Sequence, residues 1–543
     1  MANKQQNRQK SAQYRPSTMP GFLINLYLIL MFSFFPLFLT QQFVRARRDK
    51  YTLYLILSGV LILSVVIVSL MDYFEAKRHQ KADLHIKPIS CADISFLCFF
   101  GFAAISTLLS KYPAESFLGV FPNGGRNNGL LLMTVYLLVY LVITRRYHFK
   151  DYVIAVYLVF SSVVAFLAIV NFFYIDLIRV YDGYIDLWKL FEDTSNANTN
   201  VLLNFGSTLG NKNLIAAFMC LFLPVAVMTF VVTEKRYLRI IGGIAAAFAY
   251  CGLLCADSTS AILGLVIAVA AMAIFSARRY DYLKRYLLAL AIMLAASKLL
   301  RLFSYIMGDI SKGFEFIQTF LIYSRAVYIP LAVCAVLFIL MQVFEKKFAP
   351  HYPKKAVVIT LIVLTVGGIC AGIWAVVYYS FIAPEAQLSE NLSGLLRFDE
   401  KWGTHRGYYW IKSLDEYKNF DILRKLFGYG PDSTVVVMEP YFPEMLTKFN
   451  ETSTDTVHNE FLNYFITQGA LGLLSYLMIL GTITVRAIRR AKNDPVILIF
   501  LSAVICCAAQ SVVNLYQPIT TPIFFIFLSI TEALNRQTDI KRA

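Results

Sequence analysis

HNEFLNYFITQGALGLLSYLMILGTITV, residues 458–485, begins in a polar loop and continues as an apolar run long enough to cross a membrane. If a helix begins at His458, a rotation of about 100° per residue returns Gly469 and Gly472 to within about 50° of His458. Glycines on that face would let another helix approach closely and would turn His458 toward protein rather than lipid. The alternative interpretation is that His458 only caps the helix and that the glycines only pack.

Apolar runs of this length recur along nearly the whole chain and decide its fold class. Hydrophobic residues make up 58% of the 543 residues, and charged residues make up only 15%. Roughly fourteen runs of about 17 to 25 residues are each long enough to cross a hydrocarbon core about 30 Å thick. They lie at about 21–43, 51–74, 90–110, 128–145, 152–174, 213–233, 237–256, 259–276, 283–302, 326–344, 356–382, 458–485, 495–513 and 518–535. We therefore predict an all-α polytopic membrane protein that forms one bundle of about fourteen transmembrane helices.

Long polar segments separate some of these runs and give the chain its predicted organisation. We divide it into a polar tail (1–20), helices 1 to 11 (21–382) with a long loop (175–211), a larger loop (383–457), helices 12 to 14 (458–535) and a second tail (536–543). Loops of this length inside a compact protein are usually functional or disordered. The apolar patterning around Tyr408, Trp410 and Leu414 predicts that the larger loop folds as short helices over the bundle.

The net charge of +16 does not indicate a nucleic-acid partner, because the basic residues gather in every second loop between apolar runs. This positive-inside pattern predicts a protein of the cytoplasmic (inner) membrane with both termini in the cytoplasm. The loops 175–211 and 383–457 would then be extracytoplasmic. The cluster Arg45, Arg47, Arg48 and Lys50 would also lie outside. That placement breaks the rule and leaves the orientation of the first hairpin open.

The nine cysteines fall in or at the edges of apolar runs, and the larger loop has none, which argues against structural disulfides. Cys251 and Cys255 have a spacing that would suit a metal ion, but no histidine or second cysteine pair accompanies them. We interpret both as small buried hydrophobic residues and predict neither a metal site nor a cofactor.

The predicted topology separates the six histidines, because His405 and His458 alone fall in extracytoplasmic segments. If the chemistry is extracytoplasmic, these two are the candidates. His405 adjoins Arg406 in a flexible turn, Gly403-Thr-His-Arg-Gly407, and the alternative for Arg406 is a solvated loop charge. Gly428-Tyr-Gly-Pro431 is a turn signal without a phosphate-loop lysine, so we assign it a structural role.

His458-Asn459, followed by nine residues and then Gly-x-x-Gly, resembles the outer-loop motif of the O-antigen ligase and O-antigen polymerase superfamily. Further features agree in order over about residues 117–474: Gly125-Arg-Asn-Asn-Gly129, Ser207-Thr-Leu-Gly-Asn-Lys-Asn213, Thr404-His-Arg406 with Trp410, and Gly428-Tyr-Gly430. The resemblance implies a membrane glycosyltransferase of the GT-C type. Such an enzyme passes a glycan from an undecaprenyl-diphosphate carrier to an acceptor hydroxyl on the outer face of the cytoplasmic membrane.

The resemblance also implies roles for single residues. His458 matches the family's loop histidine, a general base, and Arg406 matches the loop arginine that binds the diphosphate. The family has a second arginine, but Thr259 stands in its place here, so Arg126 or Arg325 would supply the second anionic contact. Further candidate substrate-binding residues are Asn459, His405, Asn211 and Asn213. The chemistry needs no metal, because an arginine fork suits phosphate geometry and the chain lacks an Asp-x-Asp pair.

The sequence leaves three functions to compare. The outer loops are net acidic, with twelve acidic and eight basic residues in 383–457 and five and two in 175–211. Such a surface would repel a phosphate-rich acceptor, which favours a polysaccharide polymerase over a ligase that attaches finished glycan to a lipid, wall or protein acceptor. A flippase or other transporter is less favoured, because Asp93, Lys298 and Glu532 all lie toward span ends. The expected partners are the lipid-linked glycan, an acceptor glycan or lipid, a flippase and a chain-length regulator.

Overall fold

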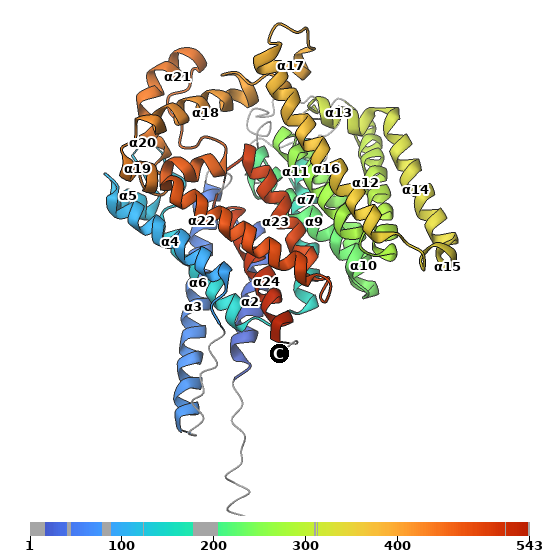
Figure 1. The fold of residues 1–543 in the computed structure, drawn as a ribbon, viewed down its shortest axis with the longest axis horizontal. Coiled ribbons are helices and arrows are strands. Elements are labelled where there is room, and N and C mark those ends of the chain that lie inside the picture. Colours follow the sequence, from blue (N-terminus) through green and yellow to red (C-terminus); the bar gives the residue numbers. More distant parts are fainter. Residues whose placement is uncertain are drawn as a thin grey trace, which may run out of the picture.

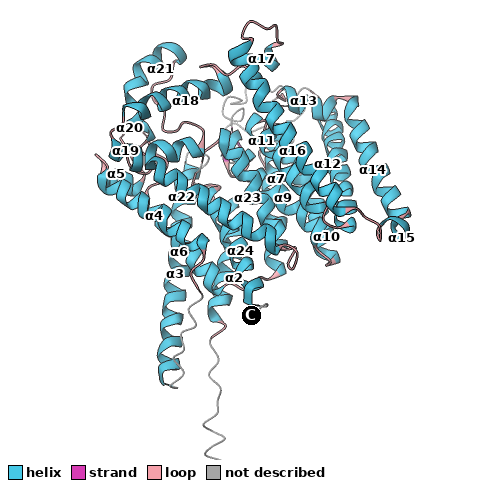
Figure 2. Ribbon diagram, in the orientation of Figure 1, coloured by secondary structure: helices cyan, strands magenta, loops and turns pink. Residues whose placement is uncertain are grey.

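The computed structural model describes residues 17–40, 45–78, 88–122, 124–177, 205–308, 311, 313–515 and 517–540. The regular secondary structure of the described residues is helical, apart from a short hairpin, β1 (Phe205–Gly206) with β2 (Gly210–Asn211), and an isolated bridge between Phe121 and Gly124. Helices fill Figure 2 from one end of the molecule to the other. Most of the predicted loop 175–211 lies outside the described residues.

Every predicted apolar run forms a helix. Eleven described helices are long and apolar enough to cross a membrane: α2 (Met19–Leu37), α3 (Ala46–Arg78), α4 (Cys91–Leu109), α7 (Asp151–Phe172), α9 (Lys212–Val232), α10 (Arg236–Cys255), α11 (Thr259–Ser276), α12 (Tyr280–Met307), α14 (Tyr328–Val343, preceded by the 3-10 turn η4, Arg325–Val327), α16 (Lys354–Val377, continued by the π turn η5, Tyr378–Ile382) and α22 (Glu460–Arg490). The other three runs form α6 (Leu130–Arg146), α23 (Ile497–Gln510) and α24 (Thr521–Ile540). The prediction of an all-α, multi-pass membrane protein is confirmed, whereas the count of about fourteen spans stays a prediction.

The helix α9 is the centre of the bundle, because every side chain from Leu214 to Val232 is buried. A helix that is apolar all round is stable in such a position, with neighbours on every side. One neighbour, α10, approaches closely at Gly242, where a Cβ atom would lie 2.9 Å from the backbone nitrogen of Phe230. By contrast, α14 and α16 have no buried residue, so their apolar side chains are left to face lipid.

The segment 383–457 folds as short helices at one end of the bundle, as predicted (Figure 1). These helices are α17 (Glu390–Leu396), α18 (Trp402–Asn419), α19 (Ile422–Phe427), α20 (Thr434–Met438) and α21 (Phe442–Phe449), with a 3-10 turn, η6 (Glu439–Tyr441), before α21. Tyr408, Met438, Met445 and Val457 form their buried core together with Ile466 of α22. The helix α15 (Glu345–Phe348) and the C-terminal end of α24 lie toward the opposite end of the molecule.

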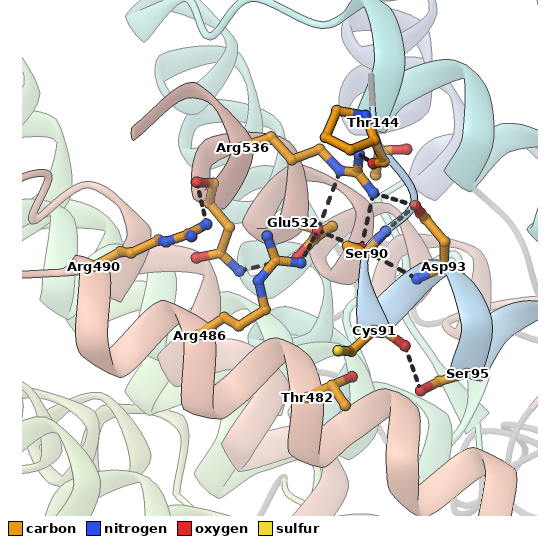
Figure 3. Close-up of polar contacts among 12 residues, drawn as sticks. Ser90, Cys91, Asp93, Ser95, Thr144, Thr482, Arg486, Arg490, Glu532 and Arg536 are labelled. Carbon is orange, nitrogen blue, oxygen red and sulfur yellow. Dashed lines mark hydrogen bonds and ion pairs between the residues drawn. The ribbon is translucent and has the colours of Figure 1, made fainter. Parts of the chain in front are cut away.

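The ionisable residues inside the spans have structural partners. The carboxylate of Asp93 accepts hydrogen bonds from Arg145 at 2.9 Å and from Arg536 at 2.5 Å. Glu532 pairs with Arg536 at 3.1 Å and also with Arg486, and Figure 3 shows how these side chains join α4, α22 and α24. Elsewhere, Lys298 Nζ donates to backbone carbonyls at the C-terminal end of α13 (Phe316–Tyr323). Buried charges engaged in this way stabilise helix contacts and are not free to bind a transported solute.

Candidate functional site

The loop that carries His458 ends where α22 begins. Asn459 is the N-cap of α22, and its side-chain oxygen accepts a hydrogen bond from the backbone N–H of Leu462 at 3.0 Å. His458 precedes this cap, with a left-handed φ of 52°. The prediction that a helix begins at His458 is therefore wrong, and so is the shared face with the two glycines. The capping role belongs to Asn459, which leaves the imidazole of His458 available for another function.

Gly469 interrupts α22 rather than continuing it. Its φ of 71° and ψ of −176° are non-helical, and a Cβ atom there would lie 2.3 Å from the carbonyl carbon of Leu426 in α19. The predicted close approach at this glycine is thus confirmed, although the partner is the folded loop. A Cβ atom on Gly472 would instead meet Gln468 of the same helix. Gly430 completes the contact by donating its N–H to the carbonyl of Thr467 at 2.8 Å, as its assigned structural role predicted.

A cavity of about 260 Å³ lies beside His458. Four segments far apart in the sequence meet there: the start of α3, the loop before α6, the β2–α9 junction and the break between α23 and α24. Its polar lining residues are Arg47, Arg126, Asn211, Asn213, His458, Asn514 and Gln517. The structure therefore brings together four of the candidates predicted from the sequence and adds Arg47, Asn514 and Gln517 to them.

His458 lines this cavity, and its surroundings favour the neutral imidazole. Burial lowers the pKa of its imidazole well below the usual range, and the positive charges of Arg126 and Arg406 lower the pKa further. Its Nδ1 atom is buried and has no hydrogen-bond partner among the described residues. The ring lies nearly parallel to that of Tyr409, with 6.2 Å between centroids. A neutral imidazole with a vacant nitrogen can accept a proton from a bound hydroxyl group.

Arg126 is fixed by two carboxylates of the folded loop. Its Nε and Nη2 atoms donate to Oδ1 of Asp455 at 2.9 and 2.6 Å. The backbone N–H groups of Arg126 and Asn128 donate to Oδ2 of Asp432 at 2.6 and 3.1 Å. Burial raises the pKa of Asp432 to about 7, although these two N–H groups oppose the shift. The contacts bind the loop before α6 to the loop that carries His458 and keep the guanidinium at the cavity.

Arg47 comes from the basic cluster that broke the positive-inside rule. Its Nη1 atom lies 3.9 Å from Oδ2 of Asp455, the same carboxylate that holds Arg126. Lys50, one helical turn further on, is buried and donates from Nζ to the carbonyls of Phe35 and Pro36 at the end of α2, at 3.0 and 2.9 Å. Within this cluster, Arg47 therefore lines the cavity, and Lys50 binds the carbonyl groups at the end of α2. Its breach of the charge rule was the sequence signal that could have identified Arg47.

Asn211 and Asn213 present amide donors to the cavity. The side-chain oxygen of Asn211 accepts the backbone N–H of Asn213 at 2.8 Å and so caps α9. The side-chain oxygen of Asn213 accepts a hydrogen bond from Ser258 at 2.7 Å, and Asn514 donates to its backbone carbonyl at 3.2 Å. Neither side-chain NH₂ group donates a hydrogen bond to a protein acceptor within the described ranges, so both are available to a ligand. Asn514 and Gln517 lie in the polar break between two apolar runs, which is the signal that sequence reasoning missed.

Arg406 lies near this cavity but does not line it. It follows Gly403, Thr404 and His405, which are all left-handed with φ of 61°, 60° and 66°. Burial lowers the pKa of its guanidinium, while Glu315 opposes that shift. Arginine nevertheless stays protonated at neutral pH. Its side chain makes no hydrogen bond or ion pair within the part of the chain that the structure describes, so its donors are available to a ligand.

The remaining candidates lie away from the cavity or have structural partners. The His405 ring stacks on Phe449 with 4.0 Å between centroids, and its Nδ1 atom lies 3.1 Å from Glu451. Arg325 is exposed on η4 and does not line the cavity. Thr259 donates to Glu315 at 2.8 Å. Of the two arginines considered as the second anionic contact, Arg126 is the one beside His458.

The cavity is suited to a phosphate-bearing ligand. Two arginine side chains and several amide groups supply hydrogen-bond donors, and a guanidinium matches the geometry of phosphate oxygens. Among the described residues, no group of three or more His, Cys, Asp or Glu side chains could hold a metal ion. Left-handed residues other than glycine occur in or beside each of the five sequence motifs, at Asn127, Ser207, His405, Asp432 and His458. Strained backbone of this kind often accompanies binding sites.

Comparison with known proteins relates one segment of the chain to a family. No curated protein matches the sequence. Residues 314–477 match the family model described as O-antigen ligase, and this segment contains both Arg406 and His458. The resemblance predicted from the sequence is thereby confirmed. The match over residues 314–477 supports membership of the O-antigen ligase superfamily.

Proposed function

We propose that this protein transfers a glycan from an undecaprenyl-diphosphate carrier to an acceptor hydroxyl at the extracytoplasmic face of the cytoplasmic membrane. The observation that carries the proposal is the cavity in which a neutral His458 lies beside Arg47 and Arg126. A base next to donors for a diphosphate is the combination that this transfer requires. The family match supports glycan transfer in general, and the carrier and acceptor are part of the proposal.

The donor diphosphate would lie against the cationic side of the cavity. Arg47, Arg126 and the NH₂ groups of Asn211 and Asn213 would hold its oxygens, with Arg406 approaching from α18. As the bond between the sugar and the diphosphate breaks, negative charge grows on the leaving oxygen. Fixed guanidinium donors stabilise that charge in the transition state, and they do so without a divalent cation.

The acceptor hydroxyl would lie against His458. Its oxygen attacks the anomeric carbon, its proton passes to the imidazole, and the lipid diphosphate leaves with the electron pair of the broken bond. General-base assistance of this kind contributes about 10²- to 10⁴-fold to the rate. In-line displacement would invert the anomeric centre.

Donor binding would also strengthen the base. The charges of Arg126 and Arg406 help to keep the pKa of His458 low, and a bound diphosphate would neutralise them. The pKa of the imidazole would then rise toward its ordinary value, which makes it a better proton acceptor when donor is present.

Within this reaction class we propose polymerisation rather than ligation. The segment 383–457 carries an excess of acidic residues, which disfavours a phosphate-rich lipid acceptor and tolerates a neutral or basic repeat unit. Deletion of the gene should leave single repeat units on their carrier in place of long surface chains. Long polymerised glycan stranded on the carrier would instead assign the protein to ligation, the alternative within the same family.

A further inference from the structure

A second and larger cavity, of about 920 Å³, lies at the other end of α22. It opens where the turn between α11 and α12, the start of α16 and the turn between α22 and α23 come together. Six cationic side chains line it, and none of its lining residues is acidic. These cations are Arg278, Arg279, Lys354, Lys355, Arg489 and Lys492.

This cavity is separate from the site at His458. The helix α22 starts two residues after His458, and its part beyond the break at Gly469, residues 470–490, alone corresponds to about 32 Å at about 1.5 Å per residue. Arg489 lies in the last turn of that helix, and Lys492 follows it. The two cavities share no residue, and the second plays no part in the proposed transfer.

The positive charge in this cavity is largely uncompensated. Lys354, Lys355, Arg489 and Lys492 have no hydrogen bond or ion pair through their side chains in the described ranges, whereas Arg279 lies 3.4 Å from Asp281. Cations on separate loops that converge on one cavity repel each other, and a bound anion would relieve this repulsion. The N-terminal ends of α12 and α16 add their partial positive charge at the same place.

Hydrogen bonds join the segments that form the walls of the cavity. Arg278 donates from Nη1 to the carbonyl of Ile488 at 3.4 Å, which joins the α11–α12 turn to α22. Tyr352, just before α16, donates from its hydroxyl to the carbonyl of Ala277 at 2.9 Å. The basic side chains are therefore presented by a fixed frame, unlike the independent loop charges that the positive-inside rule alone would produce.

The cavity is also amphipathic. Phe275, Val358 and Leu498 line its apolar part, while the cations surround them. Val358 belongs to α16, which has no buried residue and so offers a continuous apolar surface leading away from the cavity. An inorganic anion would use only the cations, whereas a phospholipid would use both parts, with its head group at the cations and an acyl chain along α16.

We propose that this cavity binds the phosphate head group of an anionic phospholipid. The lipid would bridge α16 to α12 and α22, supplying contact to a helix that packs little against the rest of the protein. Cations near an anionic lipid surface contribute about fivefold each in affinity. The double variant Arg489→Gln/Lys492→Gln should therefore bind such a lipid about 25-fold more weakly. Neither residue belongs to the His458 cavity, so glycan transfer in detergent should stay unchanged.

The test is lipid binding to the purified full-length protein in nanodiscs that contain phosphatidylcholine with or without phosphatidylglycerol. Retained phosphatidylglycerol is counted by native mass spectrometry, together with the rise in thermal midpoint that it produces. The matched control, Lys346→Gln/Lys347→Gln, removes two exposed cations of α15 that do not line the cavity. Selective loss of lipid in the first variant supports the proposal. Equal retention in both variants, or equal protection by inorganic phosphate alone, would overturn it.

Discussion

Arg126 and Asp455 form a two-pronged contact in which Nε and Nη2 of the arginine donate to a single carboxylate oxygen at 2.9 and 2.6 Å. Asp455 lies three residues before His458, so this ion pair links the arginine to the segment that carries the base. The contact uses two of the five N–H donors of the guanidinium. The other three remain for a phosphate, at a position that the carboxylate fixes.

Asp455→Asn tests this positioning role. Asparagine keeps an acceptor oxygen but loses the charge, so the guanidinium of Arg126 should be positioned less firmly. The donor diphosphate should then be oriented less well for transfer. We expect kcat to fall about tenfold or more, because small misplacements of binding groups are costly in catalysis. Asp415→Asn is the matched control, since Asp415 forms an exposed pair with Lys418 in the same folded segment. Equal kinetics for both variants would show that Asp455 does not position Arg126 for transfer.

Arg406→Lys tests the arginine that follows the left-handed turn Gly403–His405 within α18. Lysine keeps the charge but cannot present two parallel donors to one phosphate. Affinity for the lipid-diphosphate donor should fall about tenfold, the value of one lost hydrogen bond to a charged group. Arg325→Lys serves as the control, because Arg325 is exposed outside the cavity. If both variants bind donor as the unmodified protein does, Arg406 is a bystander.

Asp432→Asn tests the buried carboxyl beneath the loop before α6. Because the pKa of Asp432 is raised to about 7 in the folded protein, the folded state binds a proton that the unfolded state has released above about pH 4. This contribution to stability is complete at low pH and falls as the pH rises, by about 1.4 kcal/mol per pH unit between about 4 and 7. The amide mimics the protonated acid, so the thermal midpoint of the variant should vary less over that range. A variant with the same pH dependence as the unmodified protein would show that Asp432 does not titrate there.

Gly469→Ala tests the contact between α19 and α22. The new Cβ atom would lie 2.3 Å from the Leu426 carbonyl carbon on a backbone with φ of 71°, so the folded loop would have to move away. We expect a loss of stability greater than about 1 kcal/mol and a loss of transfer, because His458 moves with the loop. Gly481→Ala, on the same helix, meets nothing within 4 Å and should be tolerated. Similar midpoints for the two variants would contradict the packing described above.

The fold could be predicted because lipid imposes a simple rule on sequence. Every apolar run became a helix, since a backbone in hydrocarbon must satisfy its hydrogen bonds internally. The start of α22 could not be placed by periodicity alone, although Asn459 is a favoured capping residue and was available as a signal. The break at Gly469 depends on the close approach of Leu426, which the sequence does not encode locally.

The candidate site was predictable only in part, because it depends on contacts between segments that are far apart in the sequence. Motifs identified His458, Arg126, Asn211 and Asn213, but they could not reveal which loops meet around them. Asp455 acts through a contact with a residue 329 positions away, and such tertiary pairings leave no mark in composition or spacing. Arg47 could be identified from the sequence, because a basic cluster on the extracytoplasmic side of the predicted topology indicates an acidic partner.

The most direct test of the central claim is glycan transfer by the purified His458→Ala protein, supplied with a lipid-diphosphate glycan and an acceptor. Donor binding should remain within about threefold of the unmodified protein, because the arginines hold the diphosphate, while the rate of transfer should fall by at least about 10²-fold. A thermal midpoint close to that of the unmodified protein would show that the variant is folded. Transfer within a few-fold of the unmodified rate would contradict the assignment of His458 as the base.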